Sequence, residues 1–170
     1  MNNASTQVYR VYIRATPEQI WQALTDPEWT NRYGYTGYAQ YDLRPGGEYK
    51  ILPNPEFKAM AEARSGMPLD VVTDGEVIEA NPPWKLVQTW RLLMDPEIMA
   101  EGFTRITYEI QKVGTSGCAL TLTHELEGAP KLAALVGGSE VDPMAGGGGW
   151  PWVLSDLKTV LETGQNLAMR

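Results

Sequence analysis

The run Gly146-Gly147-Gly148-Gly149-Trp150 opens the stretch that decides the fold, because the residues after it carry a strong helical pattern. From Trp150 to Leu167 the sequence reads WPWVLSDLKTVLETGQNL. Apolar residues recur there at helical spacing, namely Val153, Leu154, Leu157, Val160 and Leu161. This spacing predicts one amphipathic helix about 27 Å long. We expect the helix to close an apolar cavity in a curved antiparallel sheet.

Upstream of this helix, seven segments have the alternating, β-branched and aromatic composition of strands. They cover residues 8–14, 38–43, 48–52, 74–80, 85–93, 104–112 and 119–125. Arg44-Pro45-Gly46-Gly47 predicts the turn of a hairpin between the second and third of them. The predicted order is therefore strand, short helix, six strands and long helix, which favours an α+β class with one curved antiparallel sheet around the helix.

Shorter helical signals lie between the strands. Thr16-Pro17-Glu18-Gln19 supplies a capping residue and a first-turn proline, so it starts a helix that we expect to end near Asp26-Pro27. Residues 28–32 have room for one more turn. Within residues 53–70, four residues recur at helical spacing and predict one or two turns of amphipathic helix. These residues are Phe57, Met60, Ala61 and Arg64. Residues 127–149 are rich in glycine and predict loops, and residues 1–170 read as one domain.

Composition excludes several classes of function. The net charge of −7 and the pI near 4.7 argue against binding of nucleic acid and against attraction to an anionic membrane surface. No apolar run approaches the roughly 20 residues that span a bilayer, and the first residues do not resemble a signal peptide. Cys118 is the only cysteine, which leaves no internal disulfide. We expect a soluble cytoplasmic protein, either a monomer or a homodimer.

Several phrases, in this order along the chain, resemble the START-like (SRPBCC) superfamily, and within it the group of the activator homologue of the Hsp90 ATPase. They are Ala15–Pro27, Leu43–Tyr49, Asp74–Trp90, Leu120–Glu125 and Gly149–Leu157 with Leu161. The resemblance implies a helix-grip fold and a pocket for an apolar or amphipathic small molecule. It implies no particular reaction, because members of the superfamily include binders, carriers and cyclases. Residues 53–70 and 127–149 depart from the pattern, and both are expected at the mouth of the pocket.

His124 is the only histidine and the only side chain that ordinarily titrates near neutral pH. In the last strand it shares a phase with Leu120, Leu122 and Leu126, so it faces the apolar side. One interpretation is a pocket group that binds ligand or acts as a general base. The other interpretation is a structural histidine with satisfied hydrogen bonds.

Aromatic side chains supply the other candidate ligand-binding residues, since a ligand pocket needs apolar surface with few polar groups. Trp90 lies in phase with inward positions of its strand, and Tyr108 does the same in the next one. Trp29 and Tyr33 belong to the connection before the second strand, whereas Trp150 and Leu154 belong to the last helix. Packing in the core is the competing interpretation for each of these side chains.

Other chemistry finds little support. The glycine run precedes a helix but lacks the Lys-Ser/Thr ending of a phosphate-binding loop. One histidine and one cysteine, six residues apart, do not make a metal site. No serine lies in a nucleophile motif. We therefore predict no metal, no cofactor and no catalytic residue.

Three functions remain open. The leading hypothesis is non-catalytic binding of a small hydrophobic or amphipathic molecule. A second is a cyclase or hydratase-like enzyme in the same pocket, using His124 with Tyr108, Glu109 or Glu125. The third is a stress-linked, co-chaperone-like protein that acts on a protein partner through its surface.

Overall fold

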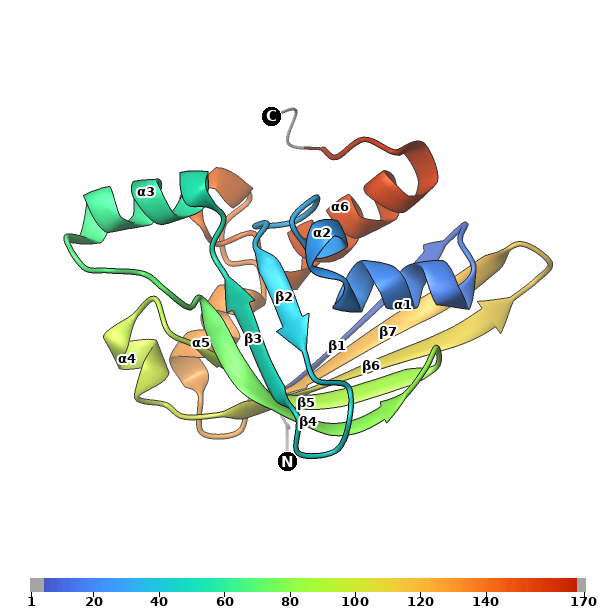
Figure 1. The fold of residues 1–170 in the computed structure, drawn as a ribbon, viewed down its shortest axis with the longest axis horizontal. Helices are drawn as coiled ribbons and strands as arrows, with labels where there is room; N and C mark the ends of the chain where they lie inside the picture. Colours follow the sequence, from blue (N-terminus) through green and yellow to red (C-terminus); the bar gives the residue numbers. More distant parts are fainter. Residues whose placement is uncertain (1–4, 168–170) are drawn as a thin grey trace.

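One antiparallel sheet organises the part of the chain that the computed structural model describes, residues 5–167 (Figure 1). Within those residues seven strands pair in the order β1-β7-β6-β5-β4-β3-β2. Their bounds are β1 Thr6–Ile13, β2 Tyr38–Tyr41, β3 Glu48–Leu52, β4 Thr73–Asn81, β5 Lys85–Leu92, β6 Thr104–Val113 and β7 Gly117–Glu125. Seven strands in these positions were predicted from sequence, and the prediction is confirmed.

The helices lie between these strands and after them. Their bounds are α1 Pro17–Thr25, α2 Pro27–Thr30, α3 Pro55–Ser65, α4 Pro96–Met99, α5 Pro130–Val136 and α6 Gly149–Thr163, with a short 3-10 turn, η1, at Pro143–Ala145. Figure 1 shows α1, α2 and α6 on one face of the curved sheet, and α3 standing away from it. A search of the described residues found no helix long and apolar enough to cross a membrane.

The capping signal before α1 forms as predicted. The hydroxyl of Thr16 accepts from the backbone N–H of Gln19 at 3.1 Å, and the side chain of Gln19 accepts from the N–H of Thr16 at 2.9 Å. Two donors at the start of the helix are thereby satisfied. Ile20 and Leu24 then face the core, so local sequence explains both the start and the buried face of α1.

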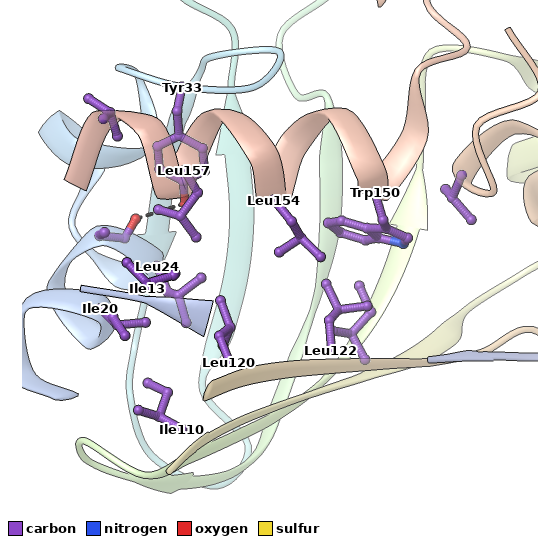
Figure 2. Close-up of a cluster of buried hydrophobic side chains, with 14 of the residues drawn as sticks. Ile13, Ile20, Leu24, Tyr33, Ile110, Leu120, Leu122, Trp150, Leu154 and Leu157 are labelled. Carbon is purple, nitrogen blue, oxygen red and sulfur yellow. Dashed lines mark hydrogen bonds between the residues drawn. The ribbon is translucent and has the colours of Figure 1, made fainter. Parts of the chain in front are cut away.

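Helix α6 presses directly onto the sheet along most of its length. Leu154, Leu157 and Val160 are buried, and Figure 2 shows the first two pointing toward β7, the strand that carries Leu120 and Leu122. Apolar side chains at helical spacing thus meet the inward side chains of strands at a spacing of two. This contact leaves no room for a ligand under the middle of the helix.

Three expectations about helix boundaries need correction. Helix α6 ends at Thr163 and not at Leu167, because Gly164 takes the left-handed conformation that ends a helix. No helix was predicted between the strands at residues 85–93 and 104–112, but α4 lies there, and Asp95 caps it by accepting from the N–H groups of Glu97 and Ile98. The predicted loop at 127–149 contains α5, which starts at Pro130 and buries Leu132 and Val136 one turn apart.

The glycine run has a specific packing reason. Gly149 has a φ of +65°, and a Cβ placed on it would collide with the backbone carbonyl of Val136 at the end of α5. The N–H of Gly148 donates to the hydroxyl of Tyr35 at 2.9 Å. Only glycine allows so close an approach of two backbones, so the run lets α6 start against α5.

Candidate ligand cavity

A cavity of about 850 Å³ lies between the β2–β6 part of the sheet and the first turn of α6, and it continues along α3. Such a volume lies within the range of about 300–1,000 Å³ that is usual for small-molecule sites. The segments 53–70 and 127–149, which were expected at the mouth, both contribute lining residues.

The lining is mainly apolar and includes nine aromatic residues. It contains Tyr33, Tyr35, Tyr41, Tyr49, Phe57, Trp90, Tyr108, Trp150 and Trp152. These residues come from the loop after α2, from four strands, from α3 and from α6. More than half of the aromatic residues in the chain are therefore gathered at one cavity.

Hydrogen bonds hold most of the cavity tyrosines in place. Tyr33 donates to the carbonyl of Ala23 at 2.8 Å. The hydroxyl of Tyr49 lies 2.9 Å from the hydroxyl of Thr73 and accepts from the indole N–H of Trp90 at 3.1 Å. Burial raises the pKa of Tyr33, and it raises that of Tyr49 to about 12. These phenols are therefore neutral at physiological pH.

Tyr41, which lines the cavity, forms a second polar pair with Gln88, which lies outside the lining. The Tyr41 hydroxyl donates to Oε1 of Gln88 at 2.6 Å, and Gln88 is almost fully buried. Tyr41 stands directly opposite Tyr49 in the β2–β3 hairpin, with ring centroids 4.7 Å apart. Burial raises the pKa of Tyr41 well above its usual value, so this hydroxyl is also neutral.

The structure brings four of the seven predicted site residues to the cavity wall: Tyr33, Trp90, Tyr108 and Trp150. The other three lie outside the lining. Trp29 packs against the core beneath the guanidinium of Arg32, 4.3 Å from its ring centroid. Leu154 is in the core between α6 and the sheet. His124 lies behind Trp150, in edge contact with its ring.

His124 belongs to a buried chain of hydrogen bonds. Its Nδ1 accepts from the indole N–H of Trp150 at 3.1 Å, and its Nε2 lies 2.7 Å from the hydroxyl of Thr104. The Thr104 hydroxyl lies 2.9 Å from the carbonyl of Trp90 and donates to it. Because an indole can only donate, Nδ1 carries no proton and Nε2 carries one. Burial lowers the pKa of His124 to about 3, so the ring is neutral.

The mouth of the cavity is lined with methionine. All five methionines within residues 5–167 contribute to the lining and all are exposed: Met60, Met67, Met94, Met99 and Met144. Methionine is flexible and polarisable, and it adapts its shape to different apolar surfaces. We use "the mouth" for these five residues, which lie on α3, α4, η1 and the adjoining loops.

Helix α3 covers this mouth without burying any side chain of its own. Its residues Phe57, Met60, Ala61 and Arg64, which the sequence singled out by spacing, all line the cavity. The side chain of Asn54 caps the helix by accepting from the N–H of Phe57 at 2.8 Å. Its amide also donates to Asn31 and Thr36, each at 2.9 Å. One asparagine thus ties α3 to the loop after α2.

Charge is confined to the outer part of the lining. The ionisable acidic and basic residues there are Glu56, Arg64 and Asp95, and all three side chains are exposed. No group of three or more His, Cys, Asp or Glu side chains that could hold a metal occurs among the described residues. The arrangement can therefore enclose an apolar body and offer it neutral hydrogen-bonding groups.

Sequence reasoning missed Tyr41, Tyr49, Gln88 and the methionines. A signal for the two tyrosines was present, because the hairpin turn at residues 44–47 places them opposite each other on one face. Gln88 lies two residues before Trp90, so strand alternation places it on the same inward face as Trp90. No local signal indicated that the methionines gather at one mouth, since they come from three separate parts of the chain, around α3, around α4 and in η1.

A curved antiparallel sheet that grips a long C-terminal helix beside an aromatic cavity defines a helix-grip protein. Residues 14–162 match the family described as Activator of Hsp90 ATPase homolog 1-like protein. The chain belongs to this family, as its resemblance to the group predicted. No curated protein matches the sequence significantly.

Solved structures share the fold at low sequence identity. CalU16 from Micromonospora echinospora is 19% identical with a TM-score of 0.62, and the match covers 94% of this chain and 77% of CalU16. An Aha1 dimer from Colwellia psychrerythraea is 20% identical with a TM-score of 0.61, and the match covers 95% of this chain and 98% of that protein. An HSP90 activator from Plasmodium falciparum is 21% identical with a TM-score of 0.54, and the match covers 96% of this chain and 91% of that protein. At these identities the likeness shows the fold alone.

Proposed function

We propose that the protein binds a small hydrophobic or amphipathic molecule in the cavity between the sheet and the first turn of α6, without catalysing a reaction on it. The observation that carries this proposal is the cavity of about 850 Å³, whose wall is mainly apolar with nine aromatic residues and whose charged residues lie at the rim. Burial of apolar ligand surface there is favourable by about 25 cal/mol for each Å². Tyr33, Trp90, Tyr108 and Trp150 are the proposed contacts from the predicted set.

Two experiments test the proposal. Native mass spectrometry of freshly purified protein should show a co-purifying small molecule. In addition, the neutral fluorophore 6-propionyl-2-(dimethylamino)naphthalene should bind and gain fluorescence. Ala61→Trp places an indole in the cavity and should abolish this gain, whereas Ala63→Trp, on the exposed side of α3, should preserve it. Equal binding by both variants, or none by the native protein, would remove the proposal.

The surroundings of His124 favour a binder over an enzyme. Both ring nitrogens are already hydrogen-bonded within the protein, and the ring does not line the cavity. Glu109 and Glu125, its predicted carboxylate partners, are exposed and alternate with inward residues of their strands. General acid–base catalysis contributes at least about 100-fold. Once a ligand is identified, His124→Ala should therefore change its affinity only a few-fold. A loss of turnover by about 100-fold or more would instead indicate an enzyme.

A second candidate function is action on a protein partner, which the family match favours. The relevant activity would be stimulation of the Hsp90 ATPase, and it would make the protein stress-linked and cytoplasmic. Adding the purified protein to Hsp90 and measuring ATP hydrolysis tests this directly. A clean negative, together with no Hsp90 in a pull-down, excludes it. Light scattering would distinguish a monomer from a homodimer, the state that the Colwellia Aha1 structure describes.

A further inference from the structure

We propose that the inserted end of the ligand is uncharged and carries an oxygen acceptor, such as a ketone or ether, which receives a hydrogen bond from Tyr108. This inference rests on the proposed binding function and specifies its ligand class. It is carried by two polar groups that lack a hydrogen-bond partner among residues 5–167, one in the cavity wall and one buried behind that wall, and by the position of the charged lining residues at the exposed rim.

The hydroxyl of Tyr108 is the first of these groups. Tyr108 lies on β6 opposite Leu86 and lines the cavity. Tyr33, Tyr41 and Tyr49 each hydrogen-bond to a protein group, whereas Tyr108 makes no hydrogen bond to any described residue. A tyrosine hydroxyl withdrawn from bulk water ordinarily finds a partner. The partner of Tyr108 must therefore come from the contents of the cavity.

The amide of Gln88 is the second group. Its Nε2 is buried and has no hydrogen-bond partner among the described residues. Gln88 pairs with Ile106, two residues before Tyr108 on the same strand, so Gln88 and Tyr108 are diagonal neighbours on the same face. Such diagonal positions lie about 7–8 Å apart. Gln88 itself does not line the cavity and its Nε2 is fully covered, so this amide lies behind the wall next to Tyr108.

Turning the amide around does not remove the spare donor. In the present orientation Tyr41 donates to Oε1 of Gln88, and the amide N–H groups are left over. In the reverse orientation Nε2 would donate to the Tyr41 oxygen, and the hydroxyl hydrogen of Tyr41 would be left over. Either way the pair keeps one unused donor, which in the reverse orientation belongs to Tyr41, a lining residue. Only a donor on a lining residue, Tyr108 or Tyr41, can reach an acceptor on the ligand.

The floor also excludes charge. Burial raises the pKa of Tyr108 well above its usual value, so the phenol donates as a neutral group. Glu56, Arg64 and Asp95 stay at the exposed rim. A carboxylate inserted among the tyrosines would lose its hydration without meeting a cation, which is strongly unfavourable. An uncharged oxygen on an apolar, preferably aromatic, skeleton meets both conditions.

Three naphthalenes of similar size test the inference by isothermal titration calorimetry: 2-acetylnaphthalene, 2-ethylnaphthalene and 2-naphthoate. Tyr108→Phe should weaken binding of the ketone about three- to tenfold, as expected for one hydrogen bond, and leave the ethyl compound within about twofold. The unchanged ethyl affinity also shows that the variant is folded. Tyr12→Phe, on an exposed tyrosine outside the lining, is the control and should change neither. Naphthoate should bind at least about tenfold more weakly than the ketone.

Each outcome separates this inference from the proposed function. If the ketone and the ethyl compound bind but Tyr108→Phe weakens both equally or neither, the acceptor is wrong while the binding function stands. If naphthoate binds as tightly as the ketone, the requirement for an uncharged ligand is wrong. If none of the three compounds binds, the proposed function fails and the inference fails with it.

Discussion

The indole N–H of Trp150 donates to Nδ1 of His124 across 3.1 Å, and this bond joins the start of α6 to β7. The rings of Trp90 and Trp150 are neighbours in the cavity wall, with centroids 6.0 Å apart. His124 thus holds one wall of the cavity in place from behind. We regard it as a positioning residue for Trp150 and not as a group that touches the ligand.

The neutral state of His124 makes the protein sensitive to acid. The pKa of this ring falls from 6.5 to about 3 on folding, because burial penalises its charged form. Between these values the unfolded chain binds a proton that the folded chain does not. The free energy of unfolding therefore decreases as the pH falls below 6.5, by up to about 1.4 kcal/mol per pH unit.

His124→Gln isolates this contribution, because glutamine does not titrate. The variant should be less stable at pH 7, since the flexible amide does not reproduce the ring geometry that bonds both Trp150 and Thr104, but its stability should fall less steeply with acid. Urea unfolding of both proteins between about pH 7 and pH 5 measures the two slopes. Parallel slopes would contradict a neutral, buried His124.

Gly149 should be much less tolerant of substitution than Gly146. Both have positive φ, but a Cβ on Gly146 meets nothing within 4 Å, whereas one on Gly149 meets the Val136 carbonyl. Gly146→Ala should cost about 1–2 kcal/mol from backbone strain alone. Gly149→Ala adds a steric collision and should cost roughly 2–5 kcal/mol. Thermal and urea unfolding compare them, and equal costs would argue against the close approach of α6 and α5.

The backbone amides of helix α3 should be less protected from hydrogen exchange than those of α1 and α6. None of its side chains is buried, and exposed ion pairs of Lys58 with Glu62 and Asp70 support it. Its amides should exchange with deuterium at least about tenfold faster than those of α6. A saturating neutral naphthalene ligand should slow them, because it fills the space under Phe57 and Met60. Exchange in α1 is the internal control, and an α3 already as protected as α6 would refute the idea.

Asp156 should be important for stability, because its buried carboxylate connects three segments. It accepts from the N–H of Gly34 at 2.9 Å and from that of Leu167 at 2.6 Å. Asp156→Ala should cost about 2–4 kcal/mol, since charge-assisted hydrogen bonds are lost in the core. Asp156→Asn should cost less, because its amide oxygen still accepts one bond. Urea unfolding at neutral pH ranks them, and an Ala variant within about 1 kcal/mol of the native protein would contradict this role.

Local patterns were enough to predict most secondary structure. The capping residues around Thr16 predicted the start of α1, and alternation predicted the seven strands. The same alternation predicted that Trp90 and Tyr108 face inward. Helices α4 and α5 were not predicted, although Pro96 and Pro130 mark their first turns. Both helices are short, and the many glycines around α5 favoured a loop.

These patterns did not predict which inward side chains line the cavity and which are packed in the core. Periodicity along a strand or helix indicates the face on which a side chain lies, but not which other element covers it. His124, Leu154 and Tyr108 all have inward phase, yet the first lies behind Trp150, the second packs in the core and the third reaches the cavity. The difference depends on contacts between segments that are distant in sequence.

The sequence by itself determined that Trp150 begins a long amphipathic helix, since a repeat of 3.6 residues is a local property of the chain. Only the tertiary structure decided where the cavity lies. Leu154 and Leu157 fill the space under the middle of α6, so the cavity is displaced to its first turn and extends along α3. A cavity is the volume that remains after all side chains have packed, and no single segment encodes it.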